Sequence, residues 1–290
     1  MRGLLLTVKP AIKKLTKSAA TYRPAIVTFI DVLGFRELVR KSSAEEIRKI
    51  VQLTQRKASS DPDELTALER KEDVNWTRTV AFSDSIIRVR PYDAEYSEGP
   101  LFYEVIDLVH AQADLANQGI FIRGGMTVGD VYFENQSVYG PAFVRAYDLE
   151  SQYANVPRIV IGPEVFREFR KNPKLRKEGH DLADEVHYLR KLLRRGEDGF
   201  WFVDYLTAIA GEMDNPDVDY PKFLERCRKF IIDAANATPT ESKALQKYLW
   251  LAEYHNSVCD RSPILSDLLI TKKDIASIET LPEVSKSIRD

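Results

Sequence analysis

Cysteine and histidine are scarce in this sequence of 290 residues, which has only two cysteines, Cys227 and Cys259, and four histidines. Neither residue type occurs at the spacing of a metal site, and two cysteines make no disulfide framework, so we expect reduced thiols. Long hydrophobic runs are missing as well. None approaches the ~20 residues that span a bilayer, and the leucines at positions 4–6 are too few for the core of a signal peptide. We therefore expect a soluble protein of the cytoplasm.

An excess of charge of one sign is also missing, because 42 Lys and Arg are balanced by 44 Asp and Glu, for a formal net charge of −2. Such a balance argues against broad electrostatic binding to nucleic acid or to an anionic membrane. Residues 190–195 form a basic stretch, but acidic residues are interleaved across 171–199 and no aromatic side chains stand among the bases of that stretch. We interpret 171–199 as a solvated helix face or an insertion loop, and we expect no nucleic acid partner.

What the sequence does contain is a regular succession of strand and helix patterns. The order is β-α-β-β-α-β followed by α-β, which is typical of the split βαβ, ferredoxin-like arrangement. We therefore predict an α+β fold with a mainly antiparallel sheet and helices on one face. Strands are predicted at 25–31, 77–82, 86–89, 120–126, 127–133, 158–161 and 200–205, and helices at 35–57, 101–118, 141–153, 163–169, 220–236 and 241–258.

The chain divides into three parts by composition. Residues 1–23 are basic and weakly patterned, as in a loosely held N-terminal arm. Residues 24–205 carry the strand and helix succession, with the charged insertion at about 171–199, and we interpret them as the catalytic domain. Residues 206–290 contain the two last predicted helices and a polar tail, and we interpret them as a C-terminal helical extension.

Two aspartates stand out because each comes at the end of a predicted strand. Asp31 closes the strand at 25–31 and is followed by Gly34 and the start of a helix, whereas Asp84 lies between the strands at 77–82 and 86–89. Each alone also fits a helix cap or a turn residue. If the strands are neighbours, however, the two carboxylates can hold two divalent cations about 3.5–4 Å apart, as in enzymes acting on phosphate esters. The helix start adds amides for an anion, so together they favour a metal–triphosphate site.

Four stretches resemble the motifs of class III nucleotide cyclases, in the order in which that family has them. Residues 29–35 are similar to its F-x-D-I-x-G-F opening, and 82–85 stand in the place of the Gly-Asp pair that carries its second metal aspartate. Residues 123–131 resemble its R-x-G-I-x-x-G-x-V hairpin and 139–149 its G-x-x-V-N-x-A-x-R-L helix. With a continuation through 158–165, the likeness covers about residues 25–170.

The resemblance implies a class III cyclase homology domain with two metal ions per site, Mn2+ or Mg2+. Asp31 and Asp84, with the backbone carbonyl of Val32, are the implied ligands. The amides implied to bind the β- and γ-phosphates are those near Leu33, Gly34 and Phe35. In that family the exposed face of the sheet pairs with a second copy, so a homodimer with sites at the interface is implied.

Departures from the family pattern are as informative as the matches. Val144 and Asp148 occupy the positions of the family's ribose-orienting asparagine and its transition-state arginine. Val80 stands where the family reads the purine, and a valine offers a base edge no hydrogen bond. With these losses the chain resembles the stand-alone pyrimidine cyclases of bacterial Pycsar antiphage defence. That resemblance implies a UTP or CTP substrate and a cyclic nucleotide that acts on a separate effector.

Between the two bases we expect UTP to be favoured and CTP to come second. An arginine only donates hydrogen bonds, which suits the O4 acceptor of uracil better than the amino group of cytosine. The candidates for contacts with the base or the phosphates are Arg78, Thr79, Arg88 and Arg145. The activity is therefore that of a phosphorus–oxygen lyase, a uridylate cyclase or alternatively a cytidylate cyclase. The alternative from another class is a catalytically inert cyclase-like module that binds a nucleotide or a partner.

Overall fold

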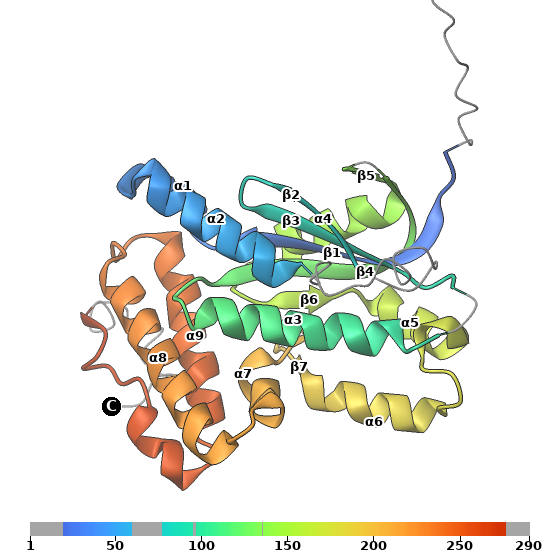
Figure 1. Ribbon diagram of the computed structural model, residues 1–290. Coiled ribbons are helices and arrows are strands. Elements are labelled where there is room, and N and C mark those ends of the chain that lie inside the picture. The colour runs from blue at the N-terminus through green and yellow to red at the C-terminus, as the bar shows by residue number, and fades with distance from the viewer. Residues whose placement is uncertain (1–19, 60–76, 95–96, 135, 277–290) are drawn as a thin grey trace, which may run out of the picture.

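The structure is a computed structural model that describes residues 20–59, 77–94, 97–134 and 136–276 (Figure 1). The predicted N-terminal arm lies outside these residues up to position 19, and so does the end of the predicted tail after position 276. No helix in the described ranges is long and apolar enough to span a bilayer. Cys227 and Cys259 are both buried and unbonded.

Most of the strands come from the apolar stretches rich in β-branched residues, as the sequence predicts, whereas those at Ser137–Tyr139 and Leu193–Arg195 were not predicted. The strands are β1 Arg23–Val32, β2 Arg78–Phe82, β3 Ser85–Pro91, β4 Ile122–Glu134, β5 Ser137–Tyr139, β6 Ile159–Ile161, β7 Leu193–Arg195 and β8 Trp201–Val203.

The helices agree closely with the predicted ranges, except that the stretch predicted as one helix at 35–57 is two. It breaks before Ser43, whose side chain forms a capping box with Glu46 and so starts a new helix. The α-helices are α1 Phe35–Lys41, α2 Ala44–Ala58, α3 Pro100–Ala116, α4 Pro141–Tyr153, α5 Pro163–Lys171, α6 Leu182–Leu192, α7 Tyr205–Ala208, α8 Pro216–Asn236 and α9 Lys243–Cys259, and the 3-10 helices are η1 Pro173–Leu175, η2 Ile209–Glu212 and η3 Pro263–Leu268.

The sheet has the order β2-β3-β1-β4-β6-β8-β7, with β5 added to the end of β4. Its first four strands, β2-β3-β1-β4, follow one another antiparallel, and β4 with β6 is the parallel pair. The α+β, ferredoxin-like fold class is thereby confirmed. It places β1, the first strand of the chain, between β3 and β4 at the centre of the sheet.

Alternate residues of β1 point to two different layers of the protein. Ile26 and Ile30 belong to the large core that also contains α3, whereas Val27 and Phe29 pack with Ala146 of α4 in a second cluster. The prediction that the helices lie on one face is therefore wrong for α4, which covers the face opposite to α2 and α3 (Figure 1). This opposite face matters for function because Asp31, two residues after Phe29 in β1, lies on the same side of the sheet as α4.

The two strands predicted at 120–126 and 127–133 are one long strand, β4. The Gly124-Gly125 pair lies inside this strand and serves close packing. A Cβ on Gly125 would lie 2.5 Å from the carbonyl oxygen of Ala146 and 2.7 Å from the backbone nitrogen of Glu150. Glycine at this position thus lets the backbone of α4 lie directly on β4.

The charged segment at 171–199 is part of the fold rather than an appended loop. It forms α6, which buries Leu189 and Leu192, and then β7, which pairs with β8 and extends the sheet. The C-terminal helices are equally integrated, since Leu224 of α8 and Leu249 of α9 are buried in the same core as β1 and α3.

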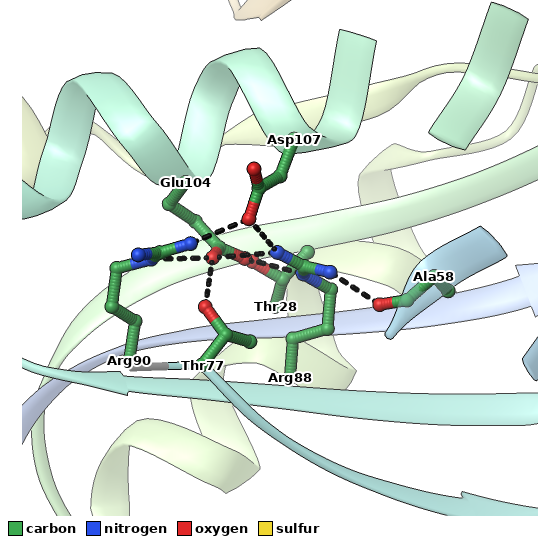
Figure 2. A network of polar contacts seen from close by, with 7 residues as sticks. All are labelled: Thr28, Ala58, Thr77, Arg88, Arg90, Glu104 and Asp107. Atoms are coloured by element: carbon green, nitrogen blue, oxygen red, sulfur yellow. Dashed lines mark hydrogen bonds and ion pairs between the residues drawn. The ribbon is translucent and has the colours of Figure 1, made fainter. Parts of the chain in front are cut away.

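A buried polar network ties β3 to α3 (Figure 2). At its centre lies Glu104 of α3, fully buried, which binds the guanidinium of Arg88 at 2.8 Å and that of Arg90 at 3.1 Å. Glu104 also accepts hydrogen bonds from the hydroxyls of Thr28 and Thr77. Arg88 and Arg90 both bind Asp107 as well, and Arg88 donates to the carbonyl of Ala58. The network thereby connects β1, β3, α2 and α3 inside the protein.

Candidate active site

Asp31 and Asp84 lie next to each other at one end of the central strands. Asp31 of β1 is paired in register with Ser85 of β3, and Asp84 comes directly before Ser85 in the two-residue turn between β2 and β3. Ser83 adopts a left-handed φ of 58° in this turn. The two carboxyl groups are close enough for Asp84 to raise the pKa of Asp31. The structure therefore brings together the two side chains that the sequence selects.

A guanidinium holds Asp31 in place from the neighbouring strand. Arg123 of β4 is paired with Asp31 in register, and its Nε and Nη2 donate to Oδ2 of Asp31 at 3.1 and 3.0 Å. The same Nη2 forms an ion pair of 2.6 Å with Oε1 of Glu150, which is buried on α4. Arg123 thus connects one carboxylate of the site with the helix that covers it.

The pKa of Asp31 is raised above its ordinary value. Burial is the main cause and Asp84 adds to it, whereas Arg123 acts in the opposite direction. The pKa of Glu150 is also raised, chiefly by burial against the opposing effect of Arg123, with Asp31 adding to the rise. A nearby cation stabilises the ionised form of a carboxyl group whose pKa is raised by burial and by a neighbouring acid. The net electrostatic environment at Asp31 therefore favours an added positive charge.

The C-terminal helix α9 reaches this end of the sheet, although sequence reasoning did not assign it to the site. A Cβ placed on Gly34 would lie 3.6 Å from the hydroxyl of Tyr248. The preceding residue, Lys247, is half-buried and interacts electrostatically with Asp31, Glu150 and Arg123. Burial and Arg123 lower the pKa of Lys247, while the two carboxylates raise it, and the net direction is downward.

One of the three backbone amides predicted to bind phosphate in the turn after β1 is already hydrogen-bonded. The backbone nitrogen of Leu33 donates to the carbonyl of Phe121 at 2.8 Å, so it is not available to a phosphate and leaves the candidate set. Gly34 is exposed and left-handed with a φ of 73°, a conformation that favours glycine, and it precedes Phe35, the first residue of α1. Val32 is paired with Ile122 at the edge of the same site.

Arg88 and Thr79 do not join the site. Arg88 is 1% exposed and its guanidinium is held by Glu104, Asp107 and Ala58 in the buried network (Figure 2). Because the strand alternates, Arg88 points to the α3 face, opposite to Asp31. The prediction that Arg88 contacts the base is therefore corrected. Thr79 is paired with Arg88, and its hydroxyl is buried without a partner among the described residues.

Arg145 and Arg78 lie toward the other end of the sheet. Arg145 of α4 donates to the carbonyl of Val128, which is paired with Ile26, five positions before Asp31. At about 3.4 Å per residue this is about 17 Å along the strand from Asp31. The structure does not place Arg145 beside the aspartates. Arg78 is exposed on β2 with its guanidinium 4.8 Å from the centre of the Phe133 ring.

The oxygen donors present fit a divalent cation bound together with a triphosphate. Both hydrogen bonds of Arg123 to Asp31 go to Oδ2, and Asp84 adds a second carboxylate. In the described ranges no group of three or more His, Cys, Asp or Glu is placed to hold a metal by itself. Mg2+ and ions like it are commonly held by one or two carboxylates plus substrate phosphates, and Asp31 and Asp84 would supply the carboxylates of such a set.

Comparison with models of protein families gives no match, and no curated protein matches the chain. Similar solved structures include the guanylyl cyclase Cya2, at 15% identity and a TM-score of 0.37, over 64% of this chain and 93% of that one. Another is the catalytic core of a rhodopsin-guanylyl cyclase with converted specificity in complex with ATPalphaS, at 14% identity and a TM-score of 0.37, over 64% of this chain and 98% of that one. At this level of similarity, the activity of the chain has to be argued from its own residues.

Proposed function

We propose that the protein is a nucleotidyl cyclase, a phosphorus–oxygen lyase that converts a pyrimidine nucleoside triphosphate into its 3′,5′-cyclic monophosphate and pyrophosphate. The observation that carries the proposal is the pair of Asp31, near the end of β1, and Asp84, in the turn that leads into the neighbouring strand β3, close to each other and to the Gly34 turn. The raised pKa of Asp31 supports a site completed by a cation. The ferredoxin-like order of the sheet agrees with the motif order on which the resemblance rests.

In this reaction the ribose 3′-oxygen attacks the α-phosphorus in line, and the bond from that phosphorus to the pyrophosphate oxygen breaks. Divalent cations at Asp31, Asp84 and the Val32 carbonyl, Mn2+ or Mg2+ and two per site, would activate the attacking oxygen and neutralise the departing pyrophosphate. Arg123 orients Asp31 through a single carboxylate oxygen. The amides of Gly34 and Phe35 are the remaining backbone donors proposed for the β- and γ-phosphates.

The proposed base is a pyrimidine, with UTP favoured over CTP. Val80, which is paired with Ile87 on the α4 face of the hairpin, offers a purine edge no hydrogen bond. With Arg88 committed to the buried network, Arg78 remains the candidate donor on the hairpin for the O4 acceptor of uracil, because it is exposed and lies on the same face of β2 as Val80, although farther along the sheet from Asp31. We further propose a cytoplasmic enzyme whose cyclic nucleotide acts on a separate effector in antiphage defence.

The substrate is tested by incubating the protein with UTP, CTP, ATP and GTP at equal concentration with Mn2+ and identifying the products. Cyclic UMP is expected to predominate, purine products to be minor, and chelation of the metal to stop the reaction. Predominant cyclic CMP would change the base and leave the reaction in place. Cyclic AMP or cyclic GMP as the main product would contradict the pyrimidine assignment, and absence of any cyclic product would contradict the cyclase.

A catalytically inert, nucleotide-binding module is the second candidate, and two observations favour it. Val144, in the position of the family's asparagine, is 54% exposed on α4, and Asp148 occupies the position of the arginine. Asp31 also has a cationic partner of its own in Arg123. The same assay separates the candidates, because the inert module binds the triphosphate and releases it unchanged.

We also propose that the enzyme works as a homodimer with its sites at the interface. Support comes from the outer side of α4, where Val144, Tyr147 and Tyr153 are 54, 50 and 43% exposed.

A Val144→Asp variant is expected to weaken dimerisation about tenfold or more, because the association would bury an unpaired carboxylate. Sedimentation over a range of concentrations, with activity measured in parallel, tests this. Ile264→Asp is the matched control, since Ile264 is 84% exposed on η3. A fully active monomer would contradict the composite site.

A further inference from the structure

We propose that α9 forms one wall of the triphosphate subsite, with the Lys247 ammonium and the Tyr248 hydroxyl donating hydrogen bonds to phosphate oxygens. This inference rests on the proposed function and extends it to a part of the chain beyond the resemblance, which ends at about residue 170. It assigns to the C-terminal helices a direct role in binding the substrate.

Lys247 and Tyr248 lie close to the candidate site. Tyr248 approaches Gly34, the exposed residue between β1 and α1, with its hydroxyl 3.6 Å from where a Cβ would stand. Lys247 is its neighbour in the chain and interacts electrostatically with Asp31 and Glu150. This part of α9 is therefore near both Asp31 and the turn that follows β1.

Both groups are uncommitted, since neither Lys247 nor Tyr248 has a hydrogen-bond or ion-pair partner among the described residues. Arg123, another cation at this place, is already bound to Asp31 and Glu150. A triphosphate brings more negative charge than the metal ions and two backbone amides balance alone, so the half-buried Lys247 is a cation available to it.

The helix that carries the two groups is firmly packed. Leu245 and Leu249, on either side of the pair, are 0 and 1% exposed in the main core. The backbone at Lys247 and Tyr248 is therefore fixed relative to β1 before a ligand arrives. Such preorganisation of the backbone lowers the entropy lost on binding.

Binding of inorganic tripolyphosphate in the presence of Mn2+, measured by calorimetry, tests the inference without requiring turnover. Lys247→Met is expected to weaken binding about 10- to 100-fold, because a hydrogen bond to a charged group contributes about 1.5–3 kcal/mol. Tyr248→Phe is expected to weaken it less, by roughly threefold to tenfold. Lys247→Arg should restore most of the affinity. Lys229→Met serves as the control, since Lys229 is exposed on the neighbouring helix α8.

Binding by Lys247→Met equal to that of the wild type, or no binding by a folded wild type, would overturn the inference. The outcome is separable from that of the proposed function. If no nucleotide is cyclised but tripolyphosphate binding depends on Lys247, the cyclase proposal fails and the phosphate subsite stands. If a nucleotide is cyclised and the KM of Lys247→Met is unchanged, only the inference about α9 fails.

Discussion

Asp84→Asn and Asp31→Asn variants are each expected to lose cyclase activity by about a thousandfold or more while remaining folded. Each replaces a carboxylate by an amide, which is a much poorer ligand for a divalent cation. Charge stabilisation by a bound metal is worth several kcal/mol in the transition state, and about 4 kcal/mol corresponds to about a thousandfold in rate. The measurement is the rate of cyclic nucleotide formation at saturating Mn2+ and substrate.

The structure also explains why these variants should fold. The pKa of Asp31 is raised in the folded protein, so ionised Asp31 is less favourable there than in the unfolded chain. Its ionisation therefore removes stability as the pH rises above its usual value of 3.8. Asp31→Asn should lack this loss and be at least as stable as the wild type near neutral pH, with Arg123 still paired to Glu150.

Asp130→Asn is the matched control for both variants, because Asp130 is an exposed carboxylate toward the other end of β4, paired with Pro24. It should retain wild-type activity. An Asp84→Asn or Asp31→Asn variant that turns over at a rate near that of the wild type would exclude the metal role of these residues.

The largest expected effect on stability belongs to Glu104→Gln, which should lower the free energy of unfolding by about 3–5 kcal/mol. Glu104 is completely buried and binds both Arg88 and Arg90, so its neutralisation leaves two guanidinium groups underpaired inside the protein. Denaturant unfolding followed by circular dichroism measures the loss. Glu45→Gln on α2, which removes only exposed ion pairs with Arg48 and Lys49, is the control and should change little.

Acid titration gives the same network a second test. Burial alone would raise the pKa of Glu104, but Arg88 and Arg90 lower it to about 2 from an ordinary value of 4.5. A lowered pKa contributes stability that is complete above the unfolded value and is lost as the pH falls from 4.5 toward 2. The wild type should therefore lose stability over that range, and Glu104→Gln should lose much less. Equal acid profiles for the two proteins would show that Glu104 is not the charged centre of the network.

Local patterns were sufficient for most of the elements and for selecting Asp31 and Asp84. The β-branched run of β1 and the helical spacing of α3 are properties of short stretches, and the order of elements restricts how a ferredoxin-like sheet can be arranged. Asp31 and Asp84 each follow from their place at a strand end. Their proximity follows once β1 and β3 are neighbours.

The remaining parts of the site depend on contacts that no short pattern encodes. Arg123 reaches Asp31 across 92 positions of sequence, and Lys247 comes from a helix beyond the recognised motifs. One signal was present for Arg123, since a lone arginine inside an apolar strand needs an acidic partner when it is partly buried. Arg88 alternates with its neighbours along β3, so it shares one face of the strand with Ile86 and Arg90. Only the position of α3 shows that this face is buried in the core.

The central place of β1 has a consequence for the order in which a newly made chain can fold. β1 is synthesised first, but both of its neighbours come later, and β4 ends only at Glu134. At about 5–20 residues per second, β1 waits roughly 3–12 s for β3, which ends at Pro91, and roughly 5–20 s for β4. An apolar strand with unpaired edges is a target for aggregation, so conditions that slow translation or deplete chaperones should lower the soluble yield of this protein more than that of proteins whose early strands pair locally.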